Sequence, residues 1–338
     1  MAWQGIEGHD EIVRRFVAAA DRGRVAGSYL FVGPAGVGKS TFARRLAQAL
    51  ACRDRRPGLV PCGSCASCVQ AEAGSHPDID VVAKPEDRAT IPLEALIGDD
   101  AHRMREGLCW RLLLRPAVAA RKAAIILDAD HLSEEGANCL LKMLEEPPDG
   151  AVIILIGTTL ERQLPTIRSR CQIVRFKPLA EEILRGILAA EFAAAQPPVT
   201  AAAIQAAAAA AGGSLARARL LLDADVAGFR DRLAGLLARR PLPGVELARE
   251  TLALVEAAGK EAPQRRARLR IVLDSAIECF RLAVRQGAAA GSSIVDEPLA
   301  RLECTLDAVA AVERNANLTV LIDAWTAMLE EPRLRSSR

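Results

Sequence analysis

One eight-residue stretch constrains the fold of this chain more than any other: Gly33-Pro34-Ala35-Gly36-Val37-Gly38-Lys39-Ser40, which fits the pattern G-x-x-x-x-G-K-[ST]. Residues 28–32 before it form a short apolar run typical of a buried strand. Residues 41–50 after it carry apolar side chains at helical spacing. A strand, a glycine-rich loop and a helix in this order predict a P-loop, and with it an α/β domain that binds a nucleoside triphosphate.

The residue types of this loop suit phosphate binding. Glycines let the backbone curl so that successive N–H groups point at one phosphate, and the helix N-terminus adds a partial positive charge. Lys39 is expected to reach the β- and γ-phosphates, and the Ser40 hydroxyl to bind Mg²⁺. The predicted nucleotide contacts are Gly33, Gly36, Gly38, Lys39, Ser40 and Thr41. The alternative, a glycine-rich turn without a ligand, is disfavoured by the flanking strand and helix.

Composition limits the remaining function classes. A chain of 338 residues, 51% apolar and 25% charged, has room for two or three folded domains and is not disordered. A net charge of +2 is too small to bind nucleic acid by bulk electrostatics, and 3% aromatics disfavour a surface that stacks single-stranded bases. Residues 1–5 lack the features of a signal peptide, and we find no apolar run that could span a membrane. We therefore expect a cytoplasmic protein.

Four of the nine cysteines cluster shortly after the P-loop helix. Cys52, Cys62, Cys65 and Cys68 have the spacing C-x9-C-x2-C-x2-C, whereas the other five cysteines are scattered. Each C-x2-C turns two thiolates toward one ion, so the cluster predicts a closed, structural zinc site with no open ligand position. Unrelated thiols in a reducing compartment are the alternative. His76 is a rival ligand, although His76-Pro77-Asp78 is more typical of a turn that opens a strand over 79–82.

A second buried strand, predicted over 122–128, ends in Asp128. P-loop ATPases normally carry two acids there, one for Mg²⁺ and one that orients the attacking water. Here Leu127 precedes the acid and Ala129 follows it, while Asp130 is displaced from the usual pair. We interpret this as a degraded hydrolysis site. The alternative is that Asp128 alone holds the metal and another group positions the water.

Further elements follow from apolar runs and breakers. A helix is predicted over 133–146, capped by Ser133 and stopped by Pro147 and Pro148, and strands over 151–157 and 172–176. Beyond Pro178 the sequence is helical, and a basic run over 265–270 is interpreted as a solvated helix face and not as a DNA site.

Together these motifs resemble the clamp-loader branch of the AAA+ ATPases, and most closely its delta-prime type from bacterial DNA polymerase III. The resemblance covers residues 1 to about 180 well and is architectural beyond them. It is carried by the P-loop, the four cysteines, the block Asn138-Cys139-Leu140-Leu141-Lys142-Met143-Leu144-Glu145-Glu146-Pro147-Pro148, Thr158-Thr159, and Leu164-Pro165-Thr166-Ile167-Arg168-Ser169-Arg170-Cys171.

The resemblance implies three domains. Residues 1–178 are expected to form an α/β P-loop (AAA+, RecA-like) domain with an inserted zinc module at 52–68. A small helical lid domain is expected over 179–240, and an all-α C-terminal collar domain over 241–338.

The resemblance also implies a function and partners. Thr158 becomes the sensor 1 residue, and Arg170, in Ser-Arg-Cys, an arginine finger acting in trans on ATP held by a neighbouring subunit. The implied cofactors are ATP, Mg²⁺ and Zn²⁺. The implied partners are gamma/tau and delta type subunits in a hetero-pentameric ring, the sliding clamp, and primer–template DNA reached through the complex. The implied function is to help load the sliding clamp onto primed DNA as part of the DNA polymerase III holoenzyme.

Two departures from the family pattern concern hydrolysis. The family pattern has an Asp followed by a Glu at the end of this strand. When the pattern is aligned without a gap from Asn138, its Asp falls on Leu127 and its Glu on Asp128. When it is aligned on the strand end instead, its Asp falls on Asp128 and its Glu on Ala129. Either register leaves the site one acid short. In the lid, Gly213-Ser214-Leu215-Ala216-Arg217 places the sensor 2 arginine one residue late, a rotation of about 100° on a helix.

Two readings from different classes remain. The first is an assembly subunit that binds ATP, hydrolyses it weakly or not at all, and donates Arg170. The second is a motor ATPase of the gamma/tau type. The missing acid and displaced Arg217 favour the first, as does a chain that ends at 338 without a long extension. A stand-alone P-loop kinase is disfavoured by the helical C-terminal third.

Overall fold

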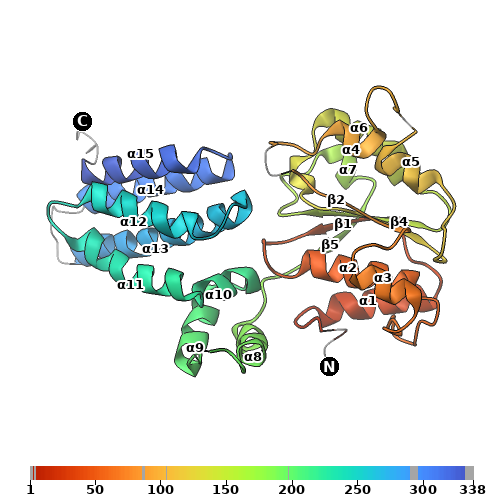
Figure 1. Cartoon of the computed structure of the whole chain (residues 1–338), viewed down its shortest axis with the longest axis horizontal. Helices are drawn as coiled ribbons and strands as arrows, with labels where there is room; N and C mark the ends of the chain where they lie inside the picture. The colour runs from red at the N-terminus through yellow and green to blue at the C-terminus, as the bar shows by residue number, and fades with distance from the viewer. Residues whose placement is uncertain are drawn as a thin grey trace. The chain divides into compact units, whose positions relative to one another are not determined.

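The computed structural model describes residues 3, 5–85, 88–103, 105–196, 198–289 and 296–331. The chain forms two compact units, residues 1–216 and 217–338 (Figure 1). The first unit is an α/β layered structure and the second is all helical. Among the described residues, no helix combines the length and apolar character needed to cross a bilayer.

A five-stranded parallel sheet organises the first unit, in the order β2-β3-β4-β1-β5. The strands are β1 (Ser28–Val32), β2 (Ile79–Val82), β3 (Lys122–Ile126), β4 (Ala151–Gly157) and β5 (Gln172–Arg175). Residues of β1, β3 and β4 are buried throughout, because a parallel sheet is covered on both faces. The predicted α/β P-loop fold is confirmed. The second predicted strand is two residues shorter than expected, since β3 ends at Ile126.

Helices cover both faces of the sheet (Figure 1). One face carries α1 (Asp10–Asp21), α2 (Lys39–Ala51) and α3 (Ala66–Glu72), and the other carries α4 (Leu93–Ile97), α5 (Gly107–Leu113), α6 (Glu134–Glu145) and α7 (Pro165–Arg168). Successive side chains along each strand point to opposite faces of the sheet and so contribute to two separate hydrophobic cores. Phe31 packs with Phe16 and Phe42 on the first face, whereas Leu30 and Val32 belong to the core on the second face.

Side-chain oxygens that accept backbone N–H groups hold the start of α6 and the segment before β2. Ser133 begins α6 as predicted, with its Oγ accepting the Gly136 N–H at 3.0 Å. The Asp78 side chain, in a residue with 0% exposure at the start of β2, accepts the backbone N–H groups of Ala117, Val118 and Ala119 at 2.7, 2.8 and 2.8 Å. That carboxylate ties β2 to the loop that leads into β3.

The helices after the sheet are α8 (Glu181–Glu191), α9 (Ala201–Ala210) and α10 (Leu215–Leu221). The boundary between the two compact units falls at 216/217, inside the segment 179–240 expected as a lid. Helices α8 and α9 therefore belong to the first unit. The division into nucleotide-binding, lid and collar domains stays a proposal.

The second unit is built from α11 (Ala224–Ala238), α12 (Gly244–Glu256), α13 (Ala262–Ala289), α14 (Asp296–Glu313) and α15 (Leu318–Glu330). Trp325 is fully buried at its centre, and its indole N–H donates to the Thr305 hydroxyl at 3.1 Å, which joins α15 to α14. The helical C-terminal third predicted from the sequence is confirmed.

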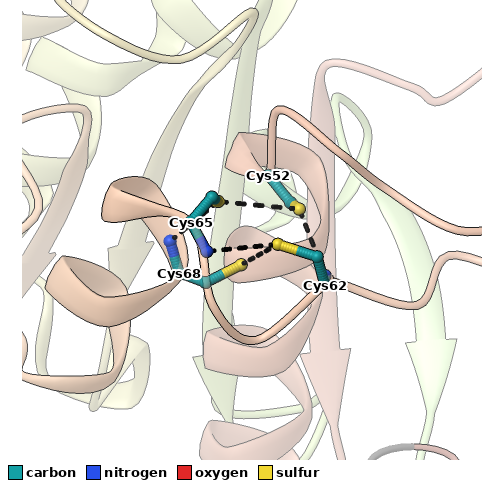
Figure 2. A group of neighbouring side chains, drawn as sticks. All are labelled: Cys52, Cys62, Cys65 and Cys68. Carbon is teal, nitrogen blue, oxygen red and sulfur yellow. Dashed lines mark hydrogen bonds between the residues drawn. The ribbon is translucent and has the colours of Figure 1, made fainter.

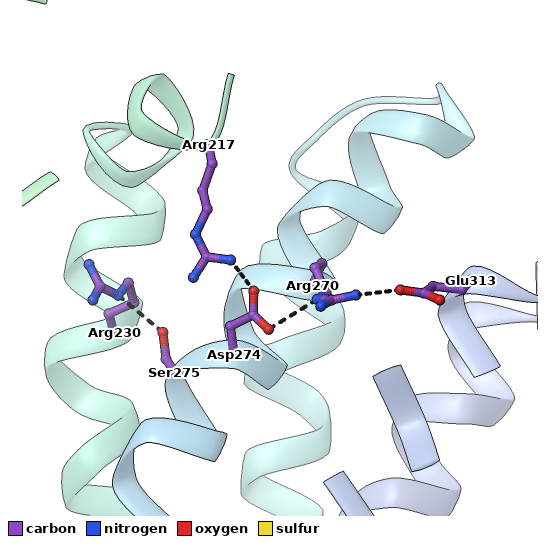
Figure 3. A network of polar contacts seen from close by, with 6 residues as sticks. All are labelled: Arg217, Arg230, Arg270, Asp274, Ser275 and Glu313. Atoms are coloured by element: carbon purple, nitrogen blue, oxygen red, sulfur yellow. Dashed lines mark hydrogen bonds and ion pairs between the residues drawn. The ribbon is translucent and has the colours of Figure 1, made fainter. Parts of the chain in front are cut away.

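The basic run on α13 differs from the prediction of a solvated helix face. Arg268 is 7% exposed and pairs with Asp223 at 2.9 Å. Arg270 bridges Asp274 and Glu313, at 3.0 Å to each (Figure 3). Periodicity can reveal the pair of Arg270 with Asp274, four residues along α13, but not the partners Glu313, from α14, and Asp223, which caps α11. Arg268 is thus a buried ion-pair partner within the helical unit, whereas the Arg270 side chain is 40% exposed.

Candidate functional site

The P-loop lies at the carboxyl end of β1, a strand with neighbours on both sides. The loop leads directly into α2, so the predicted order of strand, loop and helix is confirmed. The Gly33 N–H donates to the Thr158 carbonyl at 3.1 Å, which places the loop beside the residue that follows β4. Thr158 therefore lies where ligands of open α/β sheets bind.

Residues of the predicted lid motif contact the P-loop within the first unit. The Leu215 N–H donates to the Gly36 carbonyl at 3.0 Å. Gly36 has a φ of +76°, and a Cβ built on it would lie 2.2 Å from Ser214 Oγ. Only glycine permits this approach, so the loop and the N-terminal end of α10 form one packed surface.

Lys39 is 7% exposed and is held by the loop itself. Its ammonium group donates to the carbonyls of Gly33 at 2.5 Å and Pro34 at 2.7 Å. Burial lowers the pKa of Lys39 to about 8, an effect that the charge of Asp130 partly offsets. Ser40 and Thr41 are exposed on the first turn of α2.

The two acids after β3 have different surroundings. Asp128 is exposed and has a left-handed backbone, with φ +55°. Asp130 is half-buried, and its carboxylate accepts the Thr158 N–H at 2.9 Å and the Thr158 hydroxyl at 2.6 Å. The structure thus brings Asp130 together with Thr158, whereas the role predicted for Asp128 stays a prediction. The sequence offered only a weak signal for Asp130, namely an acid just beyond the strand end.

The N-terminal residues pack behind the P-loop. The His9 ring nitrogen Nε2 makes a 2.7 Å hydrogen bond with the Val37 carbonyl, and its ring meets Phe176 at a centroid distance of 4.9 Å. Trp3 packs against Phe42, with ring centroids 5.2 Å apart. These contacts support the loop from within the core.

Arg170 lies just before β5 and is held by the end of α6. Its Nε donates to Glu145 Oε1 at 2.7 Å, and its Nη1 donates to the Thr166 carbonyl at 3.1 Å. The guanidinium side chain is 29% exposed, whereas Arg168 lies on the exposed side of α7. Burial raises the pKa of the neighbouring Cys171 thiol to about 12, so that thiol stays protonated.

Arg217, the displaced candidate for sensor 2, belongs to the second unit. It forms an ion pair with Asp274 of α13, which also binds Arg270 (Figure 3). Its side chain is 29% exposed. This contact gives Arg217 a partner among the helices of its own unit.

The four clustered cysteines converge in space (Figure 2). Their sulfurs all lie within 4.8 Å of one another, with 4.0 Å between Cys52 and Cys65 and 3.8 Å between Cys62 and Cys68. Zinc–sulfur bonds of about 2.3 Å in a tetrahedron require sulfurs about 3.8 Å apart. The donor set and its spacing fit a zinc ion bound by four thiolates.

Backbone N–H groups already point at three of these sulfurs. The N–H groups of Cys62, Cys65 and Cys68 donate to the sulfurs of Cys52, Cys62 and Cys65 at 3.3, 3.3 and 3.4 Å. The N–H groups of Cys65 and Ser64 lower the pKa of the Cys62 thiol to about 6. The turn therefore favours a thiolate at Cys62, the form that binds metal, whereas burial raises the pKa of the Cys68 thiol to about 12.

His76 is not part of this sulfur cluster but supports it. The Asp78 N–H donates to His76 Nδ1 at 3.0 Å, so Nε2 carries the proton and donates to Ser67 Oγ at 2.7 Å. The Ser67 hydroxyl then donates to the Ala51 carbonyl at 2.8 Å. Ser67 and Ala51 each adjoin a cysteine of the cluster, so this buried chain of hydrogen bonds joins the module to β2 and α2.

Comparison with known families identifies the α/β unit. Residues 8–180, just over half of the chain, match the model of the family described as DNA polymerase III, delta subunit.

Named relatives include both types of subunit. The chain is 34% identical over 187 residues to DNA polymerase III subunit gamma/tau of Mycobacterium bovis, covering 54% of this chain and 30% of that protein. It is 33% identical over 168 residues to DNA polymerase III subunit delta' of Bacillus subtilis, covering 50% of this chain and 47% of that protein. The chain thus spans less than half the length of these curated relatives.

A solved structure with a similar outline is the DNA polymerase III gamma subunit-related protein of Thermotoga maritima, at 15% identity and a TM-score of 0.43, covering 95% of this chain and 98% of that one.

Proposed function

The chain belongs to the DNA polymerase III clamp-loader family of delta' and gamma/tau subunits, and we propose that within it the protein works as a delta' type subunit. In this role it binds ATP and Mg²⁺ through the P-loop, holds a structural Zn²⁺ and hydrolyses ATP poorly. Its partners are the other clamp-loader subunits in a hetero-pentameric ring, which loads the sliding clamp onto primed DNA.

One observation carries this proposal: a complete P-loop lies beside a strand end that has one acid where P-loop ATPases normally have two. Gly36 and Lys39 have the conformation and burial of a phosphate loop, which supports nucleotide binding. After β3 only Asp130 is directed to the residue beside the loop, and no second carboxylate accompanies it there among the described residues. Turnover needs a group that orients the attacking water as well as one for the metal, so binding without efficient hydrolysis follows.

Arg170 supplies the second part of the proposal, which is action on a neighbour. A guanidinium is planar and permanently charged, and an arginine finger delivered to a γ-phosphate contributes about 10³- to 10⁵-fold in rate. The short helix α7 and strand β5 hold Arg170 from both sides, and the Glu145 carboxylate orients it. Arg170 therefore lies in a short turn between two elements, and its side chain is partly exposed.

The test is a matched pair of substitutions in the assembled complex. We expect Arg170→Ala to leave folding, zinc content and ring assembly intact but to lower the DNA- and clamp-stimulated ATPase rate, because one neighbouring site is silenced. Arg168→Ala, two residues away on the exposed side of α7, is the control and is expected to do much less. Equal losses from both variants, or no loss from Arg170→Ala in a complete ring, would remove the basis for the delta' assignment.

A gamma/tau type motor is the second candidate, because the P-loop is intact and the identity to a gamma/tau subunit reaches 34%. The ATPase rate of the purified protein, alone and mixed with its partner subunits, separates the two. A near-background rate alone supports the delta' role. A robust rate that disappears in Lys39→Ala assigns the protein to the motor class.

A further inference from the structure

One buried side chain outside the P-loop forms a hydrogen bond with a peptide inside it. His9 lies just before α1 and is 5% exposed, and its ring nitrogen Nε2 is 2.7 Å from the Val37 carbonyl oxygen. A carbonyl oxygen only accepts hydrogen bonds, so Nε2 carries the proton and donates. This contact joins the segment before α1 to the loop that precedes α2.

The His9 side chain is held from two sides. In the first turn of α1 the Val13 N–H donates to the His9 carbonyl at 3.0 Å, which fixes the backbone. The His9 ring packs against Phe176 in a T-shaped arrangement. The Phe176 N–H in turn donates to the Val32 carbonyl at 2.7 Å, so this aromatic partner is tied to the end of β1. The ring therefore presents its N–H to the P-loop in one fixed direction.

The Val37 carbonyl belongs to the peptide that joins Val37 to Gly38. This peptide is trans, so its C=O and its N–H point in opposite directions. Val37 is 1% exposed, and His9 holds the carbonyl on the buried side, which turns the Gly38 N–H away from the core. That N–H forms no hydrogen bond with any residue in the described part of the chain. It is therefore available to a ligand, as the backbone N–H groups of a phosphate-binding loop must be.

The loop sequence does not impose this orientation by itself. Gly38 has a φ of +100°, and glycine adopts positive and negative φ about equally readily. The peptide before it can therefore rotate at little conformational cost. Rotation would replace the Gly38 N–H by the Val37 carbonyl oxygen, which repels a phosphate where the N–H would bind it. A fixed donor at the carbonyl removes this freedom.

We propose that His9 is a positioning residue of the nucleotide site, which holds the Val37–Gly38 peptide so that the Gly38 N–H faces the phosphates of bound ATP. The inference rests on the proposed binding of ATP and goes beyond it by assigning a residue outside the loop motif. His9 lies 28 residues before Val37 in the chain and contributes to affinity without touching the ligand.

Calorimetric titration of the purified full chain with MgATP tests this assignment, at a temperature at which every variant is folded. His9→Phe keeps an aromatic ring beside Phe176 but removes the donor. It is expected to weaken ATP binding about tenfold or more, because a hydrogen bond to a charged phosphate is lost. His9→Gln should bind within about threefold of wild type, since its amide nitrogen lies as many bonds from Cβ as the histidine Nε2 does.

Ser28→Ala is the matched control. Ser28 is 5% exposed at the start of β1, the end far from the loop, and its hydroxyl donates to the Leu144 carbonyl at 3.1 Å. His9→Phe and Ser28→Ala each remove a buried donor to a backbone carbonyl, so both should lower the melting temperature measured without nucleotide. Only His9→Phe should weaken ATP binding.

Recovery of affinity in His9→Gln separates a positioning role from general support of the core. Wild-type affinity in His9→Phe, equal weakening in Ser28→Ala, or no recovery in His9→Gln would overturn the assignment. If His9→Phe is not recovered folded, His9→Asn replaces it, because its shorter side chain cannot bring the amide to Val37. Wild-type protein that binds no ATP would refute nucleotide binding itself, whereas ATP binding unchanged in every His9 variant would refute only this inference.

Discussion

At the scale of single residues, burial sets the charge state of the P-loop lysine. Lys39 is enclosed by its own loop, and desolvation lowers its pKa from 10.5 to about 8. The nearby Asp130 charge opposes this shift but does not cancel it. The ammonium form therefore dominates near neutral pH and is lost within the mildly alkaline range. Nucleotide binding and folding should respond to this titration in opposite directions.

We expect ATP affinity to fall by up to about tenfold per pH unit as the pH rises above about 8, because the phosphates bind the charged form. Lys39→Arg should show no such fall, since arginine stays protonated. For folding, the unfolded chain binds more protons between about 8 and 10.5, so Lys39 makes the protein more stable as pH rises through that window. Calorimetry over a pH series measures the first effect, and a pH-independent wild-type affinity would contradict it.

For Asp78, hydrogen bonds outweigh the effect of burial on the pKa, whereas for Lys39 burial is the larger effect. Burial alone would raise the pKa of this carboxyl, but three backbone N–H groups and Lys122 hold it below its usual value. Its contribution to stability is therefore present above the unfolded pKa of 3.8 and is lost as pH falls through the lower, folded value.

Asp78→Asn should lower the free energy of unfolding by about 1–3 kcal/mol near neutral pH, because its amide cannot accept all three N–H groups. Urea denaturation measures this. Asp99→Asn, at an exposed carboxylate that accepts the backbone N–H of its near neighbour His102, is the control and should change stability little. A similar decrease in the free energy of unfolding for both variants would show that the three N–H contacts of Asp78 do not add to stability.

At the scale of elements, the cysteine module depends on the helix that follows the P-loop. Helix α2 ends beside Cys52, and α3 begins beside Cys65, so the ends of two helices position the sulfur cluster. Gln48 of α2 also donates to the Cys68 carbonyl at 3.1 Å. The sulfur cluster and the P-loop thus share one helix, with the loop at its N-terminus and the sulfurs at its C-terminus.

Protein purified without added metal should contain about one zinc per chain, as a closed site of four thiolates requires. His76→Phe should keep this stoichiometry but release zinc to a chelator about tenfold or more faster, because the Ser67 hydrogen bond that supports the module is lost. His102→Phe, at an exposed histidine on another loop, is the control. Equal release rates for wild type and both variants would refute the supporting role of His76.

At the scale of the whole molecule, the two compact units have separate cores. The sheet and its helices fill the first, and Trp325 with its neighbours fills the second. Sites described for the first unit draw on residues up to 216, and none of them uses the Trp325 core. Damage to the second core should therefore leave those sites working.

Trp325→Ala should destabilise the second unit by about 3–5 kcal/mol, because it removes a fully buried indole and its hydrogen bond to Thr305. Zinc content and ATP affinity should remain at wild-type levels. Thermal unfolding followed by circular dichroism measures the first, and elemental analysis with calorimetry the second. Val320→Ala, at a residue 66% exposed, is the control. Loss of zinc in Trp325→Ala would show that the units do not fold independently.

Local patterns predicted most elements of this fold. The buried strand over 28–32, the Ser133 cap and the convergence of the four cysteines follow from neighbours within a short stretch of chain. The position of Asp130 could not be predicted in this way, because it depends on β4 lying between β3 and β1. The ion pairs of Arg268 with Asp223 and of Arg270 with Glu313 likewise need partners from other parts of the chain, whereas the pair of Arg270 with Asp274 is local to α13.

The pair formed by Arg170 and Glu145 also determines how quickly that arginine can change partners. Its side chains are 29% and 51% exposed, and ion pairs at such surfaces contribute only about 0–1 kcal/mol. Exposed side chains exchange rotamers within about picoseconds to nanoseconds, whereas subunits assemble over about milliseconds or longer. In the proposed ring, the guanidinium can therefore leave Glu145 many times during one encounter with a neighbour. Docking of the subunits, and not release of the arginine, then sets the timing of its action.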